Sequence, residues 1–137
     1  MADANDFNTK IIEDFRANAG KVGPPFEGAP MLLLHSTGAK SGEERVHPMV
    51  FQDVGGSWAV FASKAGAPDN PAWFHNLVAN PSASIELGTE TVAVTARVLE
   101  GDEREQVWSK QKEIMPGFAD YEKATTRTIP VIVLDRA

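Results

Sequence analysis

The sequence predicts an α+β domain built on a small, mostly antiparallel β-barrel. Six short apolar or alternating stretches are separated by turn signals, which is typical of hairpin-connected strands. Three or four helical patterns lie between or beside them. The last apolar stretch, at residues 129–134, is nearly continuous, as expected of an interior strand. Together these patterns favour a barrel with added helices.

Length and composition fit one such domain. A chain of 137 residues is near the commonest domain size, and we expect residues 1–29 to form a helix and connector and residues 30–137 the barrel. A formal net charge of −6 disfavours nucleic-acid binding, which needs a broad basic surface. The absence of cysteine excludes disulfides, thiolate metal sites and a cysteine nucleophile. Without a signal peptide or an apolar run of membrane-spanning length, we expect a cytoplasmic protein.

The N-terminal stretch predicts a helix that ends near Gly20. Asn5 or Asp6 can cap it, and its apolar residues fall on one face: Phe7, Ile11, Ile12, Phe15 and Ala19. The other face carries both signs of charge, which favours packing on the domain over a lid or membrane-touching role and leaves a peripheral membrane contact open. Residues 22–30 contain three prolines and two glycines and predict an extended connector.

Residues 31–62 predict three strands joined by a long polar loop and a tight turn. We expect strands at 31–35, 46–53 and 58–62, a loop at 36–45 and a hairpin turn at Gly55-Gly56. Because proline cannot donate a ladder hydrogen bond, Pro48 is expected at a sheet edge or a bulge.

The second half of the chain predicts a helix, a hairpin, two helices and a final strand. Asp69-Asn70-Pro71 supplies a cap and a first-turn proline for a helix over 72–78. Strands at 84–87 and 91–99 meet at Gly88-Thr89, with one face expected to be buried: Val92, Val94, Ala96 and Val98. Asp102 and Glu105 form a capping box for a helix that ends at Pro116-Gly117, and a short helix over 118–125 follows.

Two short basic segments carry the candidate chemistry. Ser36–Pro48 combines small residues with Lys40 and Arg45, and Gly38 and Gly42 can take positive φ so that backbone N–H groups converge on an anion. It is not a nucleotide P-loop, because alanine stands at position 39 where that motif requires glycine. The second segment follows the third strand and contains Ser63, Lys64 and Gly66. With the positive end of the helix at residue 71, the two segments predict a groove for an extended polyanionic ligand.

The three histidines, His35, His47 and His75, could be considered as metal ligands. Their spacing matches no short ligand motif and no cysteine assists. We therefore expect structural or surface histidines and no metal site.

At these residues the chain resembles the deazaflavin-dependent nitroreductase family, proteins with a split, FMN-binding-like β-barrel that bind coenzyme F420, an 8-hydroxy-5-deazaflavin. The resemblance covers Met31 to Leu134 and rests on five motifs: Thr37-Gly38-Ala39-Lys40-Ser41-Gly42 with Arg45 and Pro48, Ala62-Ser63-Lys64-Ala65-Gly66-Ala67-Pro68, Asn70-Pro71-Ala72-Trp73-Phe74-His75-Asn76-Leu77, Pro116-Gly117-Phe118-Ala119-Asp120-Tyr121 and Arg127-Thr128-Ile129-Pro130-Val131.

The resemblance implies an F420-dependent oxidoreductase that transfers a hydride from the reduced coenzyme to a quinone, nitro compound or enone. It implies that Lys40, Ser41 and Arg45 hold the phosphate and polyglutamate tail. It further implies that Tyr121 and Ser63 donate a proton or orient the substrate. The remaining implied residues line the deazaflavin and its ribityl chain: Pro48, Met49, Val50, Ala62, Ser63, Lys64, Ala65, Gly66, Trp73, Asn76 and Leu77. For Trp73, packing in the core is an equal alternative, and for Leu77 it is the preferred one.

One departure and two alternatives remain at this point. Phe118 stands where family members often have tyrosine, so the expected pocket loses a hydroxyl, which disfavours nitroimidazoles relative to an apolar quinone. The alternatives are an FMN-dependent oxidoreductase with the same barrel and a non-catalytic F420-binding protein. The expected partners are a small-molecule acceptor and, if the chain is not a monomer, a second copy of itself.

Overall fold

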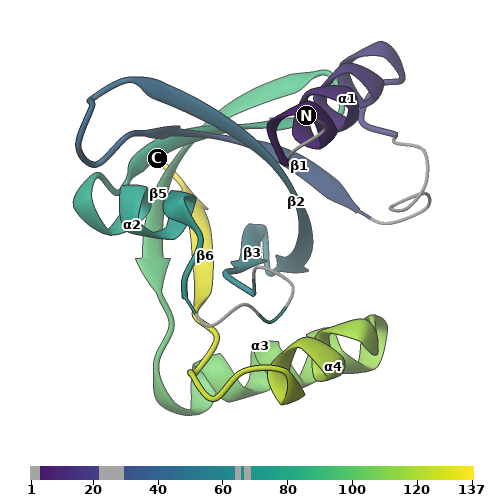
Figure 1. The fold of residues 1–137 in the computed structure, drawn as a ribbon, viewed down its shortest axis with the longest axis vertical. Coiled ribbons are helices and arrows are strands. Elements are labelled where there is room, and N and C mark those ends of the chain that lie inside the picture. The colour runs from purple at the N-terminus through teal and green to yellow at the C-terminus, as the bar shows by residue number, and fades with distance from the viewer. Residues whose placement is uncertain (1–3, 22–29, 64–65, 67–68) are drawn as a thin grey trace.

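A closed six-stranded barrel forms the centre of the molecule. The structure, a computed structural model, describes residues 4–21, 30–63, 66 and 69–137. The strands follow the order β1-β2-β3-β6-β5-β4 around the barrel, and all neighbouring pairs are antiparallel (Figure 1). Their bounds are β1 Met31–Thr37, β2 Glu44–Val54, β3 Ser57–Phe61, β4 Ser82–Leu87, β5 Glu90–Val98 and β6 Val131–Arg136. The predicted α+β barrel is confirmed.

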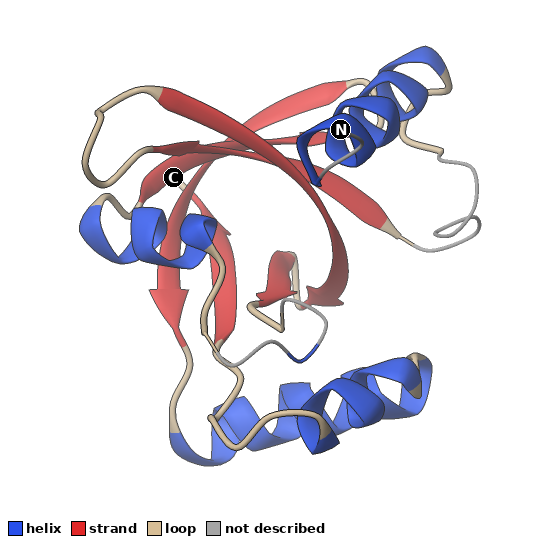
Figure 2. Cartoon of the chain, in the orientation of Figure 1, coloured by secondary structure: helices blue, strands red, loops and turns tan. Residues whose placement is uncertain are grey.

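Four helices within the described residues pack on this barrel: α1 Ala4–Ala17, α2 Ala72–Ala79, α3 Gly101–Ile114 and α4 Gly117–Lys123. Figure 2 shows the helices outside the barrel wall, with α3 and α4 next to each other. Ile11 and Phe15 of α1 are buried against the barrel, which is the packed role expected for this helix. None of the described helices is both long and apolar enough to cross a membrane.

Two apolar clusters fill the molecule, one on each side of the barrel wall. The inner cluster draws alternate residues from β1, β3, β4, β5 and β6 together with Trp73 and Leu77 of α2. The outer cluster joins the opposite faces of β1, β2, β3 and β6 to α1, α3 and α4. Alternation along each strand therefore separates the two clusters, and α2 is the helix that closes on the interior.

The turns were predicted more accurately than the helix caps. Gly55 and Gly56 have φ of 58° and 92°, as a tight hairpin turn requires. Pro48 lies in the part of β2 that pairs with β1 alone, so its missing N–H interrupts no ladder on the other side. The polar loop is shorter than predicted, because Ser36 and Thr37 continue β1 and pair with the start of β2.

Several predicted helix caps were wrong, although α2 begins at residue 72 as predicted. α1 begins at Ala4, so Asn5 and Asp6 lie inside the helix rather than at its cap. The N-cap positions of α2 and α3 are Pro71 and Glu100, and neither helix has a side-chain cap hydrogen bond. Asn70, the predicted cap of α2, instead accepts a hydrogen bond of 2.7 Å from Arg127. Asp102 lies in the first turn of α3, where its negative charge interacts favourably with the helix dipole, although its side chain does not cap the helix.

Two further expectations end differently. Val98 was expected to be buried but is 46% exposed, although it still pairs with Ile132 as the last residue of β5, just before the chain turns into α3. The predicted connector, residues 22–30, lies outside the described residues except for its last residue.

Candidate functional site

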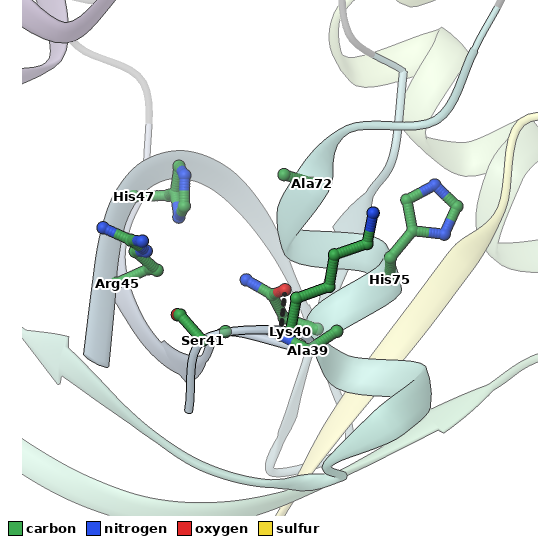
Figure 3. A pocket seen from close by; sticks show the side chains of 9 residues that line it. Ala39, Lys40, Ser41, Arg45, His47, Ala72 and His75 are labelled. Carbon is green, nitrogen blue, oxygen red and sulfur yellow. Dashed lines mark hydrogen bonds between the residues drawn. The ribbon is translucent and has the colours of Figure 1, made fainter. Parts of the chain in front are cut away.

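A cavity of about 530 Å³ lies between the β1–β2 turn and α2. Arg45 and His47 project from β2 on one side and His75 lies on α2 on the other, with Lys40 between them (Figure 3). The full lining is Gly38, Ala39, Lys40, Ser41, Arg45, His47, Ala72, His75 and Asn76. The fold thus brings the first basic segment and the first turns of the helix together.

Strand register explains why the cavity lies at the mouth of the barrel. Arg45 pairs with Ser36 and His47 with Leu34, and directly paired residues share one face of a sheet. Leu34 belongs to the inner cluster. Arg45 and His47 therefore continue the inner face of the barrel wall beyond its apolar filling.

The loop over residues 38–43 is held closed by its own backbone. The Gly38 N–H donates to the Glu43 carbonyl oxygen at 2.7 Å, and the Gly42 N–H donates to the Gly38 carbonyl oxygen at 2.9 Å. The Glu43 N–H donates to Ser41 Oγ at 3.2 Å. Because these amides are used inside the protein, the predicted convergence of backbone N–H groups on an anion was wrong for these three positions.

The two loop glycines have different roles. Only Gly42 takes positive φ, at 71°. Gly38 does not, and is required for space, since a Cβ there would lie 2.5 Å from Ser41 Oγ. The expectation of positive φ at Gly38 was wrong, although glycine is needed at both positions.

Asn76 fixes the loop to α2. Its side chain is 7% exposed, its Oδ1 accepts the Ala39 N–H at 3.0 Å, and its Nδ2 donates to Ser36 Oγ at 3.3 Å. Both ends of the amide are therefore occupied by the protein. Asn76 borders the cavity, but its polar atoms set the position of the loop rather than facing open space.

Positive charge gathers at the mouth of the cavity. Lys40 and Arg45 are both exposed, and Arg45 has an exposed ion pair with Glu43 at 3.5 Å. An exposed pair of this length contributes little and leaves the guanidinium available. Ser41 Oγ accepts from a backbone amide, so its hydroxyl hydrogen remains free to donate. Two cations and a hydroxyl thus line one cavity.

His47 and His75 are cavity residues that the sequence reasoning missed. Both were expected to be structural or surface histidines, yet both line the cavity. Burial, and then the charge of Arg45, lower the pKa of His47, so this imidazole is neutral at neutral pH. The available signal was spacing, since His47 is two residues from Arg45 along a strand and so shares its face.

Of the buried residues of α2, Asn76 lines the cavity, whereas the two apolar ones do not. Ala72, His75 and Asn76 line the cavity, whereas Trp73 and Leu77 are buried in the inner cluster. The structure thus gives Trp73 the packing role that had been the alternative to a cofactor wall. Other predicted lining residues also lie away from the cavity: Pro48 and Met49 are half-buried, Val50 belongs to the outer cluster and Ala62 to the inner one.

The described residues of the second predicted segment, Ser63 and Gly66, do not line the cavity and instead contact α4 and the chain that follows it. Gly66 has φ of 82°, and a Cβ there would lie 2.7 Å from Ala124 Cβ and 2.9 Å from the Tyr121 carbonyl oxygen. The buried Ser63 offers its carbonyl oxygen to Arg127 Nη2 at 2.9 Å. Gly66 therefore lies directly against the helix that carries Tyr121, and Ser63 is joined to Arg127 beyond the end of that helix. Lys64 and Ala65 lie outside the described residues.

Tyr121 is half-buried at the edge of an aromatic group. Its ring lies edge-on to Phe118, with centroids 5.3 Å apart. Phe118 in turn packs on Phe61 at 5.6 Å and on Trp108 at 6.1 Å. A phenylalanine at position 118 therefore belongs to the outer cluster, and the hydroxyl missing there would have been buried among aromatic rings.

The barrel thus has at its mouth a cavity lined by two cations, a kind of site that suits an anionic small molecule. Residues 9–136 match the model of the F420H(2)-dependent quinone reductase family. The chain therefore belongs to this family, which confirms the predicted family resemblance, the oxidoreductase class and the deazaflavin cofactor.

Individual relatives agree with this assignment. An F420H(2)-dependent quinone reductase of Mycobacterium tuberculosis is 36% identical over 126 residues, covering 89% of this chain and 85% of the relative. A solved F420-H2 dependent reductase, FDR-A, is 41% identical with a TM-score of 0.71, covering 77% of this chain and 94% of that one. A second solved structure, described as a domain-swapped dimer, is 37% identical with a TM-score of 0.73 and covers 93% of both chains.

Proposed function

We propose that this protein transfers a hydride from reduced coenzyme F420 to a quinone, with the anionic side chain of the coenzyme held in the cavity between the β1–β2 turn and α2. The observation that supports this site is the placement of Lys40 and Arg45 on one cavity of an otherwise acidic protein. A cavity of about 530 Å³ is in the range of small-molecule sites, and the longer tail would extend into solvent.

The donors of the cavity suit a phosphate and its neighbouring carboxylates. Lys40 and Arg45 would pair with them, and the Ser41 hydroxyl would donate to a phosphate oxygen. The first turn of α2, which begins at the cavity with Ala72, adds the positive end of its dipole. Asn76 keeps the loop at a fixed position, so these groups need little rearrangement on binding.

The ring end of the coenzyme would lie toward Ser63, Gly66 and Tyr121. When bound, the reduced deazaflavin supplies the hydride. The protein has to hold the quinone in position and exclude water, and the Tyr121 phenol would donate a hydrogen bond or a proton to the quinone oxygen. Lys64 and Ala65, together with backbone at Pro48, Met49, Val50 and Ala62, remain proposed neighbours of the ring. Trp73 and Leu77 would support this region from the inner cluster.

The proposal is tested by binding and turnover together. Purified protein is titrated with F420 and, separately, with flavin mononucleotide, and the ligand fluorescence is followed. We expect F420 to bind more tightly, because flavin mononucleotide offers only one anionic group to two cations. Preference for flavin mononucleotide would favour the alternative oxidoreductase. Oxidation of reduced F420 is then followed with a benzoquinone and with a nitroimidazole, and the quinone is expected to react faster.

Tyr121→Phe separates a catalyst from a protein that only binds the coenzyme. Removing the phenol should leave F420 affinity within about twofold and lower quinone turnover by about tenfold or more, as loss of one proton donor does. Phe118→Tyr is the matched control, since it adds a hydroxyl among buried aromatic rings. Unchanged turnover in Tyr121→Phe would remove the proposed role of the phenol.

We also propose a homodimer as the assembled form, supported by the solved relative described as a domain-swapped dimer. Light scattering after size-exclusion chromatography measures the mass directly. A monomer mass across the micromolar range would contradict this part of the proposal.

A further inference from the structure

His47 has a feature that the other cavity residues do not share. Its Nδ1 is buried with no hydrogen-bond partner, one of two such side-chain atoms in the described part of the chain. The other is Nε of Arg104, whose remaining guanidinium nitrogens are paired. Buried polar atoms are usually satisfied, so an imidazole with an unused nitrogen beside a ligand cavity requires an explanation.

The unused nitrogen determines where the proton of the neutral ring lies. A neutral imidazole carries one N–H and one lone pair. A proton on Nδ1 would bury an N–H without an acceptor, and orphaned buried N–H groups are rarer than unpaired acceptors. Burial and the charge of Arg45 lower the pKa of His47, so the ring to be considered is the neutral one. The proton therefore lies on Nε2, the ring nitrogen that is not enclosed by the protein.

We propose that His47 is a further coenzyme-binding residue, which donates an uncharged hydrogen bond from Nε2–H to an oxygen of the coenzyme side chain. This inference rests on the proposed function of the cavity. The acceptor would be an oxygen adjacent to the anionic group held by Arg45, because Arg45 and His47 are successive residues on the same face of β2. A phosphate oxygen and a ribityl hydroxyl share this acceptor chemistry.

The charged groups around His47 give the hydrogen bond a recognisable property. Arg45 lies on its own strand, Lys40 on the loop, His75 on α2, and Glu43 is paired with Arg45. Binding through Lys40 and Arg45 weakens with ionic strength because salt screens exposed charges. A bond from a neutral imidazole carries no net charge, so its share of the affinity should be nearly independent of salt.

The experiment measures F420 affinity of three variants at low and high salt. His47→Leu removes the donor, and His47→Gln keeps an N–H donor. His35→Gln is the matched control, because His35 lies on the opposite face of the β1–β2 pair and does not line the cavity. We expect His47→Leu to bind about three- to tenfold more weakly, as loss of one neutral hydrogen bond predicts. The same ratio should hold at both salt concentrations. His47→Gln should stay within about twofold of the wild type.

Nitrogen-15 NMR of the imidazole tests the tautomer without any ligand. Comparison with His47→Gln assigns the ring signals, and we expect the neutral Nε2–H form at pH 7, with Nε2 shifting when F420 is added. A neutral Nδ1–H form, or a protonated ring, would overturn the inference. Thermal unfolding of each variant confirms that affinity is compared between folded proteins.

The outcomes separate the two proposals. If the wild type binds F420 and His47→Leu binds equally well, the inference on His47 is wrong and the function of the cavity stands. If His47→Gln is as weak as His47→Leu, ring shape rather than a donor is what matters, and the inference is wrong. If the wild type does not bind F420 at all, the proposed function fails and the inference fails with it.

Discussion

The two faces of the β1–β2 pair carry polar clusters of opposite design. One group, the cavity cluster, lies at the barrel mouth and consists of basic side chains: Lys40, Arg45, His47 and His75. The second group, here called the ion-pair cluster, lies on the opposite face of these strands and includes neighbours from α1 and β4. Its members are Arg16, His35, Glu44 and Glu86. There Arg16 Nη2 meets Glu86 Oε2 at 2.7 Å, and the His35 ring lies between Glu86 and Glu44.

The difference between the clusters is the difference between holding the fold together and binding a ligand. In the ion-pair cluster basic and acidic side chains alternate, so each one has a partner within the protein, and the network joins α1 to β1, β2 and β4. In the cavity cluster, Lys40 and Arg45 carry like charges, and the carboxylate paired with Arg45 is the exposed Glu43. Their mutual repulsion is unfavourable until an anion binds. The first arrangement should contribute to stability and the second to affinity.

The largest expected effect is a loss of F420 affinity when both permanent positive charges of the cavity cluster are removed. Lys40→Ala combined with Arg45→Ala should weaken F420 binding by about a hundredfold or more, since each charge-assisted hydrogen bond contributes about 1.5–3 kcal/mol. Stability should be unchanged or slightly higher, because like charges are removed. Fluorescence titration measures the affinity and urea unfolding the stability. Arg16→Ala is the control, and equal loss of affinity in that variant would remove the contrast between the clusters.

An intermediate effect is expected at Asn76, which belongs to neither cluster but positions one of them. Asn76→Leu leaves the Ala39 N–H and the Ser36 hydroxyl without their partner, so we expect a loss of about 1–3 kcal/mol in the free energy of unfolding. F420 affinity should fall by about tenfold, because the loop loses its fixed position.

Val78→Ala is the matched control on the same helix, since Val78 is 59% exposed. Urea unfolding and F420 titration of both variants decide the outcome. If Asn76→Leu loses stability but keeps full affinity, the loop does not need Asn76 to hold its position, and the positioning role is wrong.

The sequence was sufficient for the fold wherever a signal was local. The hairpin turn at Gly55-Gly56 depends on two adjacent residues with positive φ, and it was predicted correctly. Helix caps depend on competition with distant partners: Asn70 has the side chain of a cap, but Arg127, which is 57 residues away, takes its oxygen. Such competition is invisible in a local pattern, so the cap of α2 was predicted wrongly.

The candidate site was predictable in its charges and less so in its orientation. Lys40, Ser41 and Arg45 could be selected from residue type and spacing, and the structure places them on one cavity. Which face of α2 meets that cavity could not be predicted, because it depends on how the helix closes on the barrel. From the sequence, Trp73 could equally be a ligand contact or a core residue, and packing was preferred for Leu77; α2 buries both in the inner cluster.

The smallest expected effect is a loss of stability when the ion-pair cluster is broken, and it depends on pH. The hydrogen bond from Arg16, followed by that from His35, lowers the pKa of Glu86 below its ordinary value. A carboxyl group whose pKa is lowered by folding stabilises the protein above its unfolded-state pKa of about 4.3, and this contribution is lost as the pH falls through the lowered value. Glu86→Gln should therefore reduce the free energy of unfolding by about 1 kcal/mol at pH 7, typical of a partly exposed pair.

The difference between Glu86→Gln and the wild type should shrink as the pH is lowered from about 5 and vanish once Glu86 is protonated in both states. Urea unfolding at a series of pH values measures it, with F420 affinity expected to be unchanged at pH 7. Glu90→Gln is the control, because Glu90 is exposed and its pair with Arg136 is long, at 3.9 Å. A difference that persists at low pH would mean that Glu86 stabilises the fold through packing rather than charge. A loss of F420 affinity would mean that the two faces of the β1–β2 pair are coupled, so that pairing on one side sets the cation geometry on the other.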